Sequence, residues 1–380
     1  MRIGIDASCA CGKRTGTGNY TMDLVRSLTA ADNENEYYLY FRSCCVDSNP
    51  LYAITDANVH RRIVDSRFTL FRILIRLSFA ISRDRIDVYV SPAFFLPLFG
   101  SKKFIVTFFD LNIYRLPEHW WRSGRKLDFL AMRILLPLSA RSADHIVALS
   151  SSTQKDLTTL FPSTEKKSSV IYCGIDHAKF ENALRSADAN IVPAPKSPFF
   201  LYVGVMSPTK NLVRILRAFH QFKQTDTRNS SLVLAGKECG QHMTDVLSPL
   251  IATLGLEKYV VWRGFVRDAE LAQLYQKACA LVCPSLCEGF GYPIAEAMYM
   301  GLPVITSNTS SCPEIAGDAA LCVDPSSVEA ISDAMVRVSM DRCLCDLLVA
   351  KGHTRCNMFT LEAMATQYSQ LLAKIHGKAV

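Results

Sequence analysis

Short apolar runs alternate with longer stretches of helical periodicity along the whole chain. Runs of about four to eight apolar residues with turn residues at their ends are typical of buried strands. Such runs are found at 2–7, 36–41, 86–91, 103–109, 145–150, 199–205, 231–236, 260–266, 280–285, 303–308 and 320–325. Helical patterns follow most of them, for example at 211–222 and 330–338. This alternation predicts an α/β fold whose parallel sheets are covered on both faces.

A proline-rich stretch divides the pattern near the middle of the chain. Residues 186–198, SADANIVPAPKSP, contain three prolines among small polar residues, which is typical of a linker. At about 150 residues per domain, 380 residues are expected to form two domains. We predict Rossmann-like domains over 1–185 and 199–360, and a C-terminal helix in 361–380 that packs back toward the first domain. The two domains would face each other across a deep cleft, with ligands at the carboxyl ends of the strands.

Composition narrows the class of protein. Hydrophobic residues make up 49% and charged residues 20% of the chain, which excludes a disordered or fibrous protein. The N-terminus turns polar at once, so we expect no signal peptide, and the longest uncharged run, 297–313, is too polar to span a membrane. None of the 14 cysteines forms a CxxC pair, so we expect reduced thiols in a cytoplasmic protein and no metal site.

The net charge of +7 is concentrated in one region, residues 61–141, which contains 15 basic and 6 acidic side chains. Within 67–83, three of the four arginines fall in an arc of about 40° at about 100° per residue, and nearly everything else is apolar. These arginines are Arg72, Arg76 and Arg83. An interfacial helix on an anionic membrane has this pattern, and so does a core helix with one solvated arginine stripe.

A second basic stretch, HWWRSGRKLDFLAMR at 119–133, places two tryptophans beside four basic residues. Together with the arginine stripe, it favours a peripheral location on the inner face of the plasma membrane. No motif indicates binding to nucleic acid, so the partners that we expect are small molecules, glycans and an anionic membrane surface.

The most informative segment follows the run at 280–285. Residues 287–298, CEGFGYPIAEAM, place Glu288 in a loop and Glu296 about two turns into the following helix. The glycines on either side of Phe290 let backbone amides approach a ligand closely, and the helix N-terminus after them favours an anion. Two carboxylates at different depths can bind two sets of hydroxyls on one molecule, such as the sugar and the ribose of a sugar nucleotide.

A lysine follows the run at 199–205. Lys210, in the segment PTKN, is a cation at a strand end beside a helix start, which suits a phosphate group. A nicotinamide-dependent oxidoreductase would instead carry G-x-G-x-x-G directly after its first strand. Here GTGNYT at 16–21 lacks the third glycine and follows a longer loop, which argues against that class.

These segments together resemble the retaining glycosyltransferases of family 4, which have the GT-B fold. The block 280–325 carries most of the resemblance, through its two glutamates separated by seven residues and the segments GLPVITSN and PEIAGDAALCVDP. The resemblance extends to MRIGID, GTGNY, FDL, SVIYCGIDHAKF and YVGVMSPTKNL. Within the family, the chain looks most similar to bacterial mannosyltransferases that assemble O-antigen and exopolysaccharide.

The resemblance implies roles for residues of the second domain. Glu288 would hold hydroxyls of the donor sugar, and Lys210 would pair with the donor diphosphate. Backbone amides around Phe290 and Gly291 would contact the sugar and phosphate, and Glu296 would bind the ribose. The segment from Gly264 to Val266 would line the nucleobase pocket.

In the first domain, the resemblance implies a loop with Gly16 and Gly18 that faces the diphosphate and the acceptor. Asn19, Tyr20 and Phe109 would lie on the acceptor side, and Asp110 would be catalytic. Asp110 is equally suited to capping a turn in its loop.

The sequence departs from the family pattern at two places, a histidine position and an arginine position. Phe109 stands where relatives commonly have histidine, next to Asp110. Thr209 and Val205 stand where many relatives have arginine, so Arg214 or Arg263 would have to assist Lys210.

The resemblance implies a hexosyltransferase that retains anomeric configuration and needs neither cofactor nor metal. Its expected donor is GDP-mannose, and its expected acceptor is a glycan or a polyprenyl-diphosphate-linked oligosaccharide in cell-surface polysaccharide synthesis. A UDP-sugar-dependent enzyme of the same fold and a catalytically weak sugar-nucleotide-binding protein are the alternatives, and the Phe109 position allows the second.

Overall fold

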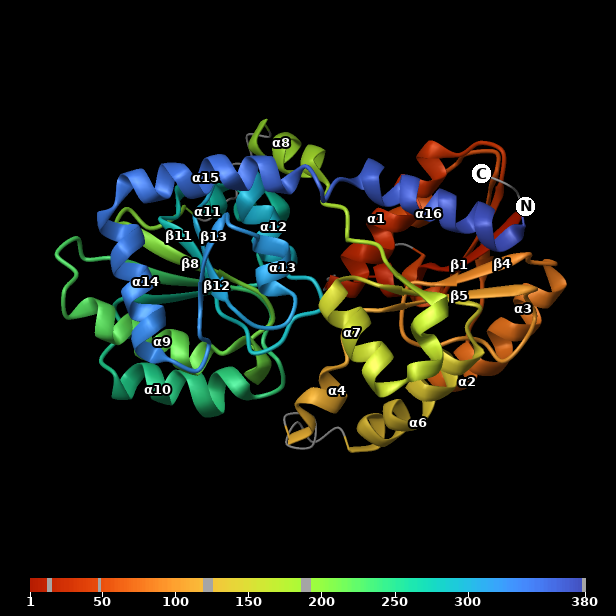
Figure 1. The fold of residues 1–380 in the computed structure, drawn as a ribbon, viewed down its shortest axis with the longest axis horizontal. Helices are drawn as coiled ribbons and strands as arrows, with labels where there is room; N and C mark the ends of the chain where they lie inside the picture. Colours follow the sequence, from red (N-terminus) through yellow and green to blue (C-terminus); the bar gives the residue numbers. More distant parts are fainter. Residues whose placement is uncertain (12–15, 47–48, 119–125, 186–192, 378–380) are drawn as a thin grey trace. The chain divides into compact units, whose positions relative to one another are not determined.

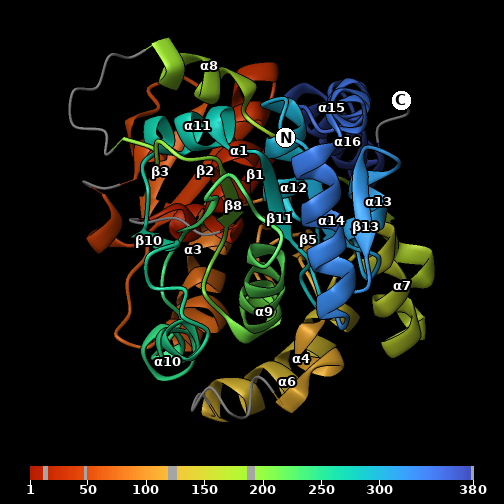
Figure 2. The ribbon, with the colours of Figure 1, turned by 90° about the vertical axis from the view of Figure 1, so that its left-hand side faces the viewer.

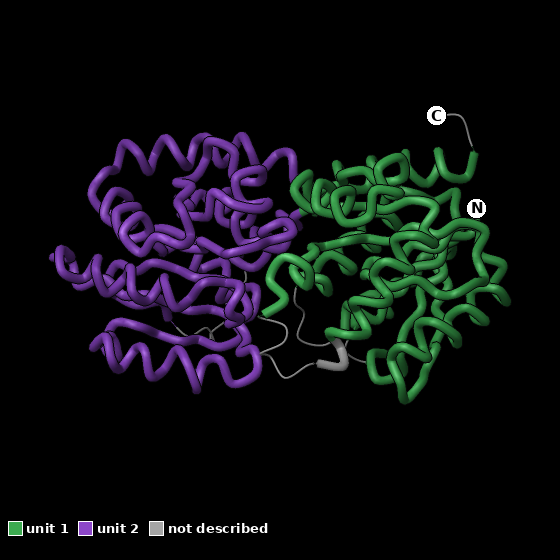
Figure 3. The backbone as a smooth tube through the Cα atoms, turned by 60° about the horizontal axis from the view of Figure 1, so that its bottom comes forward, with its two compact units in different colours: residues 1–174, 360–380 green, residues 175–359 purple. Residues whose placement is uncertain are grey.

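The computed structural model describes residues 1–11, 16–46, 49–118, 126–185 and 193–377. The chain forms two compact units (Figure 3). Unit 1 consists of residues 1–174 together with 360–380, and unit 2 consists of residues 175–359. Among the described residues, no helix is long and apolar enough to cross a membrane.

Unit 1 is built on a parallel sheet whose seven described strands have the order β3-β2-β1-β4-β5-β6-β7. Its strands are β1 (Arg2–Asp6), β2 (Glu36–Phe41), β3 (Val59–Ile63), β4 (Val88–Ser91), β5 (Lys103–Phe108), β6 (His145–Ala148) and β7 (Ser168–Val170). Its helices are α1 (Gly16–Ala31), α2 (Thr69–Phe71), α3 (Leu77–Arg83), α4 (Asn112–Arg115), α6 (Lys126–Ser142), α7 (Ser151–Leu160) and α16 (Leu361–His376), with short turns η1 (Ala7–Ala10), η2 (Ser43–Cys45), η3 (Pro50–Ala53), η4 (Arg72–Arg76) and η5 (Pro162–Lys167).

Helices cover both faces of this sheet (Figures 1 and 2). On one face, α1 packs against α16, and a buried polar cluster joins them to β5: the Tyr20 hydroxyl hydrogen-bonds the hydroxyls of Thr107, at 3.2 Å, and Tyr368. On the other face, Leu77 and Ile81 of α3 share one apolar core with Leu136 of α6 and side chains of the strands. Unit 1 is therefore completed by a helix that follows unit 2 in the chain.

Unit 2 has the same architecture, with six described parallel strands in the order β10-β9-β8-β11-β12-β13. They are β8 (Phe199–Val203), β9 (Ser231–Ala235), β10 (Val260–Gly264), β11 (Ala280–Cys283), β12 (Val304–Ser307) and β13 (Ala320–Val323). The helices are α8 (His177–Arg185), α9 (Leu212–Lys223), α10 (Ser248–Thr253), α11 (Asp268–Lys277), α12 (Tyr292–Tyr299), α13 (Cys312–Ala316), α14 (Val328–Met340) and α15 (Arg342–Cys356), with turns η6 (Pro208–Lys210) and η7 (Met243–Leu247).

The apolar periodicity of these helices sets which face each one buries. In α9, Leu212, Ile215, Leu216, Phe219 and Phe222 recur at helical spacing and are buried. They pack with α14 against strands β8 and β9 in one core cluster. The strands are apolar along their length because helices cover both of their faces.

The structure differs from the sequence prediction at three places. Strands β3 and β7 lie at the edges of the sheet of unit 1 and were not predicted, since VHRRI and SSV are too polar to read as buried runs. Helix α8, assigned to the first domain by the sequence, packs against α11 within unit 2, so the units divide after residue 174 instead of at 185. Cys11 and Cys45 are paired as a disulfide, which contradicts the expectation of reduced thiols throughout.

Candidate active site

The site forms at the point where the sheet of unit 2 changes direction. Strands β8 and β11 are neighbours, and from them the chain winds outward to β9 and β10 on one side and to β12 and β13 on the other. Ligands of doubly wound folds bind outside the carboxyl ends of the strands at such a point. Lys210 follows β8 in the turn η6, and Glu288 lies in the loop after β11.

Lys210 and Glu288 meet directly. The Nζ atom of Lys210 lies 2.5 Å from Oε1 of Glu288, and the same Oε1 accepts a hydrogen bond of 2.7 Å from the Ser285 hydroxyl. The two side chains keep 25% and 15% of their surface exposed. Among the described residues, Oε2 of Glu288 has no hydrogen-bond partner, so this oxygen can accept from a hydroxyl of a bound molecule.

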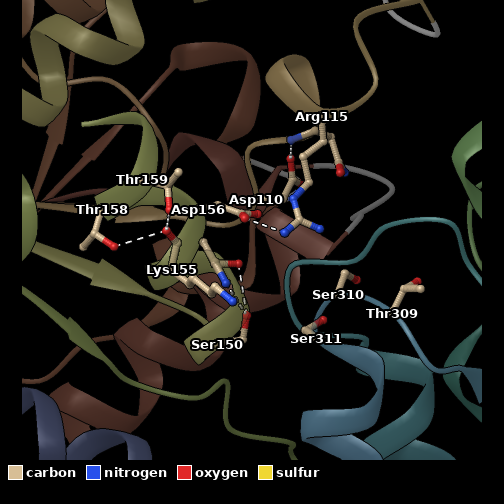
Figure 4. A network of polar contacts seen from close by, with 12 residues as sticks. Asp110, Arg115, Ser150, Lys155, Asp156, Thr158, Thr159, Thr309, Ser310 and Ser311 are labelled. Atoms are coloured by element: carbon tan, nitrogen blue, oxygen red, sulfur yellow. Dashed lines mark hydrogen bonds and ion pairs between the residues drawn. The ribbon is translucent and has the colours of Figure 1, made fainter. Parts of the chain in front are cut away.

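Two serines after β12 hold the Glu288 loop in place. The amide of Glu288 donates to the Ser310 hydroxyl at 2.8 Å, and the Ser311 hydroxyl lies 3.0 Å from the carbonyl oxygens of both Glu288 and Phe290. Figure 4 shows both serines on their loop beside Thr309. No sequence signal pointed to them, because their role depends on the neighbouring strand end.

Asn211 holds the lysine side of the site. Its amide donates to the carbonyl oxygens of Pro284, at 2.9 Å, and Pro325, at 2.7 Å, from inside the protein. Its backbone is left-handed, with φ of 64°, between the turn η6 and α9. Asn211 therefore joins the segment that carries Lys210 to the strand end that leads to Glu288.

Glycines let the backbone crowd at this edge of the sheet. Gly291 has φ of 101° and precedes α12, as expected for the segment that leads into the helix. Gly236, at the end of β9, approaches β8 so closely that a Cβ atom there would lie 1.8 Å from the carbonyl oxygen of Gly204. Only glycine fits this contact.

Glu296 lies deeper in the unit. It is 7% exposed, and its Oε2 accepts a hydrogen bond of 2.8 Å from the Tyr275 hydroxyl on α11. Burial, together with the Glu296 carboxylate, raises the pKa of Tyr275 well above its ordinary value, so this hydroxyl stays a donor at neutral pH. Tyr275 was not among the predicted site residues.

Phe290 and Val266 are buried, whereas the rest of the predicted base-pocket segment, Gly264 and Phe265, is partly or largely exposed. Phe290 is buried, with its ring 5.4 Å from that of Phe359, so it can contribute to a site only through its backbone, as the resemblance implies. Val266 follows β10 and is 9% exposed, whereas its neighbour Phe265 is 44% exposed.

The two candidate replacements for the missing arginine differ. The Arg214 guanidinium donates to Oδ1 of Asn211 at 3.0 Å, and Asn211 is the residue next to Lys210 in the chain. Arg263 lies 4.0 Å from Glu270 and donates to the carbonyl oxygen of Pro193. Of the two, Arg214 is better placed to assist Lys210.

The residues predicted in the first domain lie in unit 1 and fill different roles. Oδ1 of Asp110 accepts from the amide of Asn112 at 3.0 Å, the capping role that the sequence left open. Nearby, Arg115 forms an ion pair with Asp156 of α7 (Figure 4).

Phe109 packs edge-on against Tyr20 with ring centres 5.1 Å apart. Tyr20 is fully buried, which excludes it from direct contact with an acceptor.

Gly16 and Gly18 also differ from their expected setting. Both lie in the first turn of α1 instead of a loop, because the helix begins at Gly16. Asn19 follows them in the same turn and is partly exposed. Amides at a helix N-terminus favour an anion, so the diphosphate role stays a prediction in this new setting.

The predicted arginine stripe is corrected at one position. Arg72 is 1% exposed, and its guanidinium makes two hydrogen bonds of 3.0 Å to the Asp6 carboxylate at the end of β1. The helical wheel could not show this, because the burial of Arg72 depends on the Asp6 carboxylate and the Val64 carbonyl, which come from other segments of the chain. Only Arg76 and Arg83 are exposed. Most of the stretch 119–133 lies outside the described residues.

The thiol of Cys312 lies close enough to Glu288 for the carboxylate to affect its pKa. Burial and the Glu288 carboxylate raise the pKa of Cys312 to about 11, so the thiol is neutral at physiological pH. In the part of the chain that the structure describes, no group of three or more His, Cys, Asp or Glu side chains is placed to hold a metal ion.

Comparison with solved structures identifies the fold. A sucrose-phosphate synthase from Thermosynechococcus elongatus matches over 99% of both chains with a TM-score of 0.76 and 20% sequence identity. Anabaena HepE, solved in complex with UDP-glucose, matches over 98% of this chain and 99% of its own with a TM-score of 0.72 and 17% identity. The fold is GT-B, two Rossmann-like domains with parallel sheets, and the predicted fold class is confirmed.

Sequence families then place the chain within that class. Residues 14–179 match Glycosyltransferase Family 4, and residues 185–354 match Glycosyl transferases group 1. The chain belongs to the family 4 glycosyltransferases, as its motifs predicted. O-antigen chain mannosyltransferase B from Escherichia coli is 28% identical over 372 residues, which cover 93% of this chain and 94% of that relative.

Proposed function

We propose that the chain transfers mannose from GDP-mannose to a glycan or lipid-linked glycan in the synthesis of a cell-surface polysaccharide. Support for the sugar comes from the relative from Escherichia coli, an O-antigen chain mannosyltransferase that matches along almost its whole length. The product retains the anomeric configuration of the donor, and no divalent metal takes part.

The contact between Lys210 and Glu288 carries this proposal. An ammonium group has three donors, so Lys210 can bind a diphosphate oxygen while it keeps its bond to Oε1 of Glu288. The second carboxylate oxygen then accepts from hydroxyls of the sugar. Lys210 and Glu288 thus bind the diphosphate and the sugar, the two groups that the breaking bond joins.

In the reaction, the bond between the anomeric carbon and the diphosphate oxygen breaks. The acceptor hydroxyl attacks the anomeric carbon from the same face, and its proton passes to the departing phosphate oxygen. Lys210 and the amides of the Gly291 segment stabilise the charge of the leaving diphosphate, because fixed donors aimed at developing charge lower the barrier. No side-chain nucleophile is assigned.

The donor is tested by competition between GDP and UDP, followed by turnover with GDP-mannose and anomeric analysis of the product. We expect GDP to bind about tenfold more tightly or better, because a pocket that hydrogen-bonds guanine leaves its polar groups unpaired with uracil. Tighter binding of UDP would contradict GDP-mannose, a β-linked product would contradict retention, and binding without turnover would identify a sugar-nucleotide-binding protein.

The role of Glu288 is tested with Glu288→Gln. This variant should keep nucleotide binding and lose most of its turnover, because the amide accepts sugar hydroxyls less strongly than a carboxylate does. Glu257→Gln, an exposed glutamate of unit 2, is the matched control. Full turnover in Glu288→Gln would remove Glu288 from the donor site.

Metal independence is tested with excess EDTA. We expect full activity in EDTA, since the Lys210 ammonium supplies the positive charge that a metal would bring to the diphosphate. Loss of activity that Mg²⁺ or Mn²⁺ restores would overturn this part of the proposal.

A further inference from the structure

A ridge of large apolar side chains is exposed on unit 1. Phe68, Phe71 and Phe79 have 68%, 50% and 63% of their surface exposed along the helical segment from α2 to α3, and Leu98 and Phe99, in the loop before β5, have 63% and 42%. We call these five residues the aromatic ridge. Large apolar side chains exposed in such number on one part of a folded domain mark an interaction site.

The ridge is firmly held by the rest of unit 1. The amide of Leu98 donates to the Leu74 carbonyl at 3.2 Å and to the Ser78 hydroxyl at 3.0 Å, and the rings of Phe79 and Phe99 pack edge-on with centres 5.2 Å apart. On the inner side of the same helix, Leu77 is fully buried. The phenylalanines are therefore presented outward by a packed helix and are not side chains of a frayed end.

The exposed charges next to the ridge are mainly positive. Arg67, just before α2, and Arg76 and Arg83, on the helical segment, are exposed, and Arg83 lies 3.9 Å from the buried Asp84 carboxylate. The sequence contains no aspartate or glutamate in 66–83 or in 88–109. The surface therefore joins apolar anchors to positive charge, which complements an apolar layer that has anionic groups at its boundary.

A second apolar line runs along α6. Leu130, Ile134 and Leu138 recur every four residues and have 57%, 55% and 52% of their surface exposed. On its inner side, α6 contributes Leu136 to the same core as Leu77 of α3. Both helices thus cover one face of the sheet (Figure 1), and both turn apolar side chains away from it.

We propose that this face of unit 1 docks on an anionic lipid surface, with Phe68, Phe71 and Phe79 inserted at the boundary between headgroups and acyl chains. A second copy of the chain suits the ridge poorly, since a two-fold contact would bring Arg67 and Arg76 toward the same arginines of the other copy. Arg72 takes no part because it is buried with Asp6. The proposal does not depend on the donor or the reaction.

Sedimentation with lipid vesicles tests this proposal. The full chain is mixed with vesicles of phosphatidylcholine alone, or of phosphatidylcholine with phosphatidylglycerol. We expect binding to the anionic vesicles, with an affinity that falls about tenfold or more in Phe68→Ser/Phe79→Ser because the variant loses apolar surface that membrane contact would bury. Arg76→Ser/Arg83→Ser should lose its preference for anionic over neutral vesicles, and high salt should weaken the wild type in the same way.

Matched controls distinguish binding through the aromatic ridge from nonspecific hydrophobic binding and from the effects of misfolding. Met340→Ser/Leu347→Ser removes apolar side chains of similar exposure, 77% and 52%, from unit 2 and should bind vesicles like the wild type. Thermal unfolding of all variants reports folding. Equal binding of Phe68→Ser/Phe79→Ser and the wild type would overturn the proposal, as would no binding to either vesicle. A dimer that Phe68→Ser/Phe79→Ser dissociates, or an acidic protein captured without vesicle binding, would overturn it in favour of a protein partner.

Discussion

Each unit places one ion pair at the carboxyl end of the strand from which its sheet winds in both directions, and the two pairs differ in how completely they are satisfied. In unit 1, Arg72 uses its guanidinium on both oxygens of Asp6 and on the Val64 carbonyl, and the amide of Ser8 adds a further bond to Asp6. In unit 2, Lys210 and Ser285 both bind Oε1 of Glu288, and Oε2 accepts no hydrogen bond from the residues that the structure describes.

This difference shows that an ion pair at the same kind of strand end can stabilise the fold or be available to a ligand. In a buried pair such as Arg72 and Asp6, the carboxylate oxygens already accept hydrogen bonds from the protein. Removing one partner of such a pair is therefore expected to lower the free energy of unfolding. A pair that is partly exposed and partly satisfied can exchange partners when a ligand binds. The Asp6 pair therefore holds the segment after β1 to the helix from α2 to α3, and the Lys210 pair is the one to which we assign a part in the proposed reaction.

The largest expected effect is on stability, from Arg72→Met. This change leaves the Asp6 carboxylate buried without its partner, which costs about 3–5 kcal/mol. Urea unfolding measures this loss in the free energy of unfolding. Arg76→Met, at an exposed position of the same turn, should change it by less than about 0.5 kcal/mol.

A double variant sharpens the result. Asp6→Asn/Arg72→Met should recover part of the loss, because the stranded charge is removed together with its partner. A single Arg72→Met variant as stable as the wild type would show that the pair does not support unit 1.

The next largest effect is on activity, from Lys210→Ala. Losing the cation opposite the leaving diphosphate raises the barrier by about 3–4 kcal/mol, or about 10²–10³ in rate, while the fold is kept. Turnover is the measurement, with Arg217→Ala on the exposed side of α9 as control. A rate above about a tenth of the wild type would disprove the diphosphate contact and turn attention to Arg214.

The smallest effect concerns pH. Burial by itself would raise the pKa of Asp6, but the charge and hydrogen bonds of Arg72 hold it below its ordinary value. A carboxyl with a lowered pKa in the folded state adds stability above its unfolded pKa, about 3.9, and loses it as pH falls through the folded pKa. Urea midpoints should therefore fall below about pH 4 more steeply in the wild type than in Asp6→Asn. Parallel curves would contradict this linkage.

Much of the fold was predictable because buried parallel strands are apolar along their length. Every predicted run contains a strand, and the strands that escaped prediction, β3 and β7, lie at sheet edges where polar residues are tolerated. The position of α16 on α1 also matches the expected direction of its packing. The arginine stripe failed at Arg72 because a helical-wheel argument takes no account of partners from other segments, here the Asp6 carboxylate and the Val64 carbonyl.

The site was predictable as far as strand ends determine it. Lys210 and Glu288 follow adjacent strands, so topology alone brings them together. Ser310, Ser311 and Tyr275 were missed because their roles depend on side-chain positions from strands and helices distant in sequence. Tyr20 was misassigned for the same reason: its motif suggested an acceptor contact, and its hydroxyl lies in the core with Thr107 and Tyr368.

The packing of α16 on α1 also sets an order for folding on the ribosome. Residues 175–359 form a continuous unit with its own core and can fold as soon as they have emerged. Unit 1 is synthesised first, yet it lacks Tyr368 and the rest of α16 until the residues after 360 are made. Until then, the buried surface of α1 is uncovered in the nascent chain. The N-terminal domain is therefore completed last, although domains usually fold in the order in which they are synthesised.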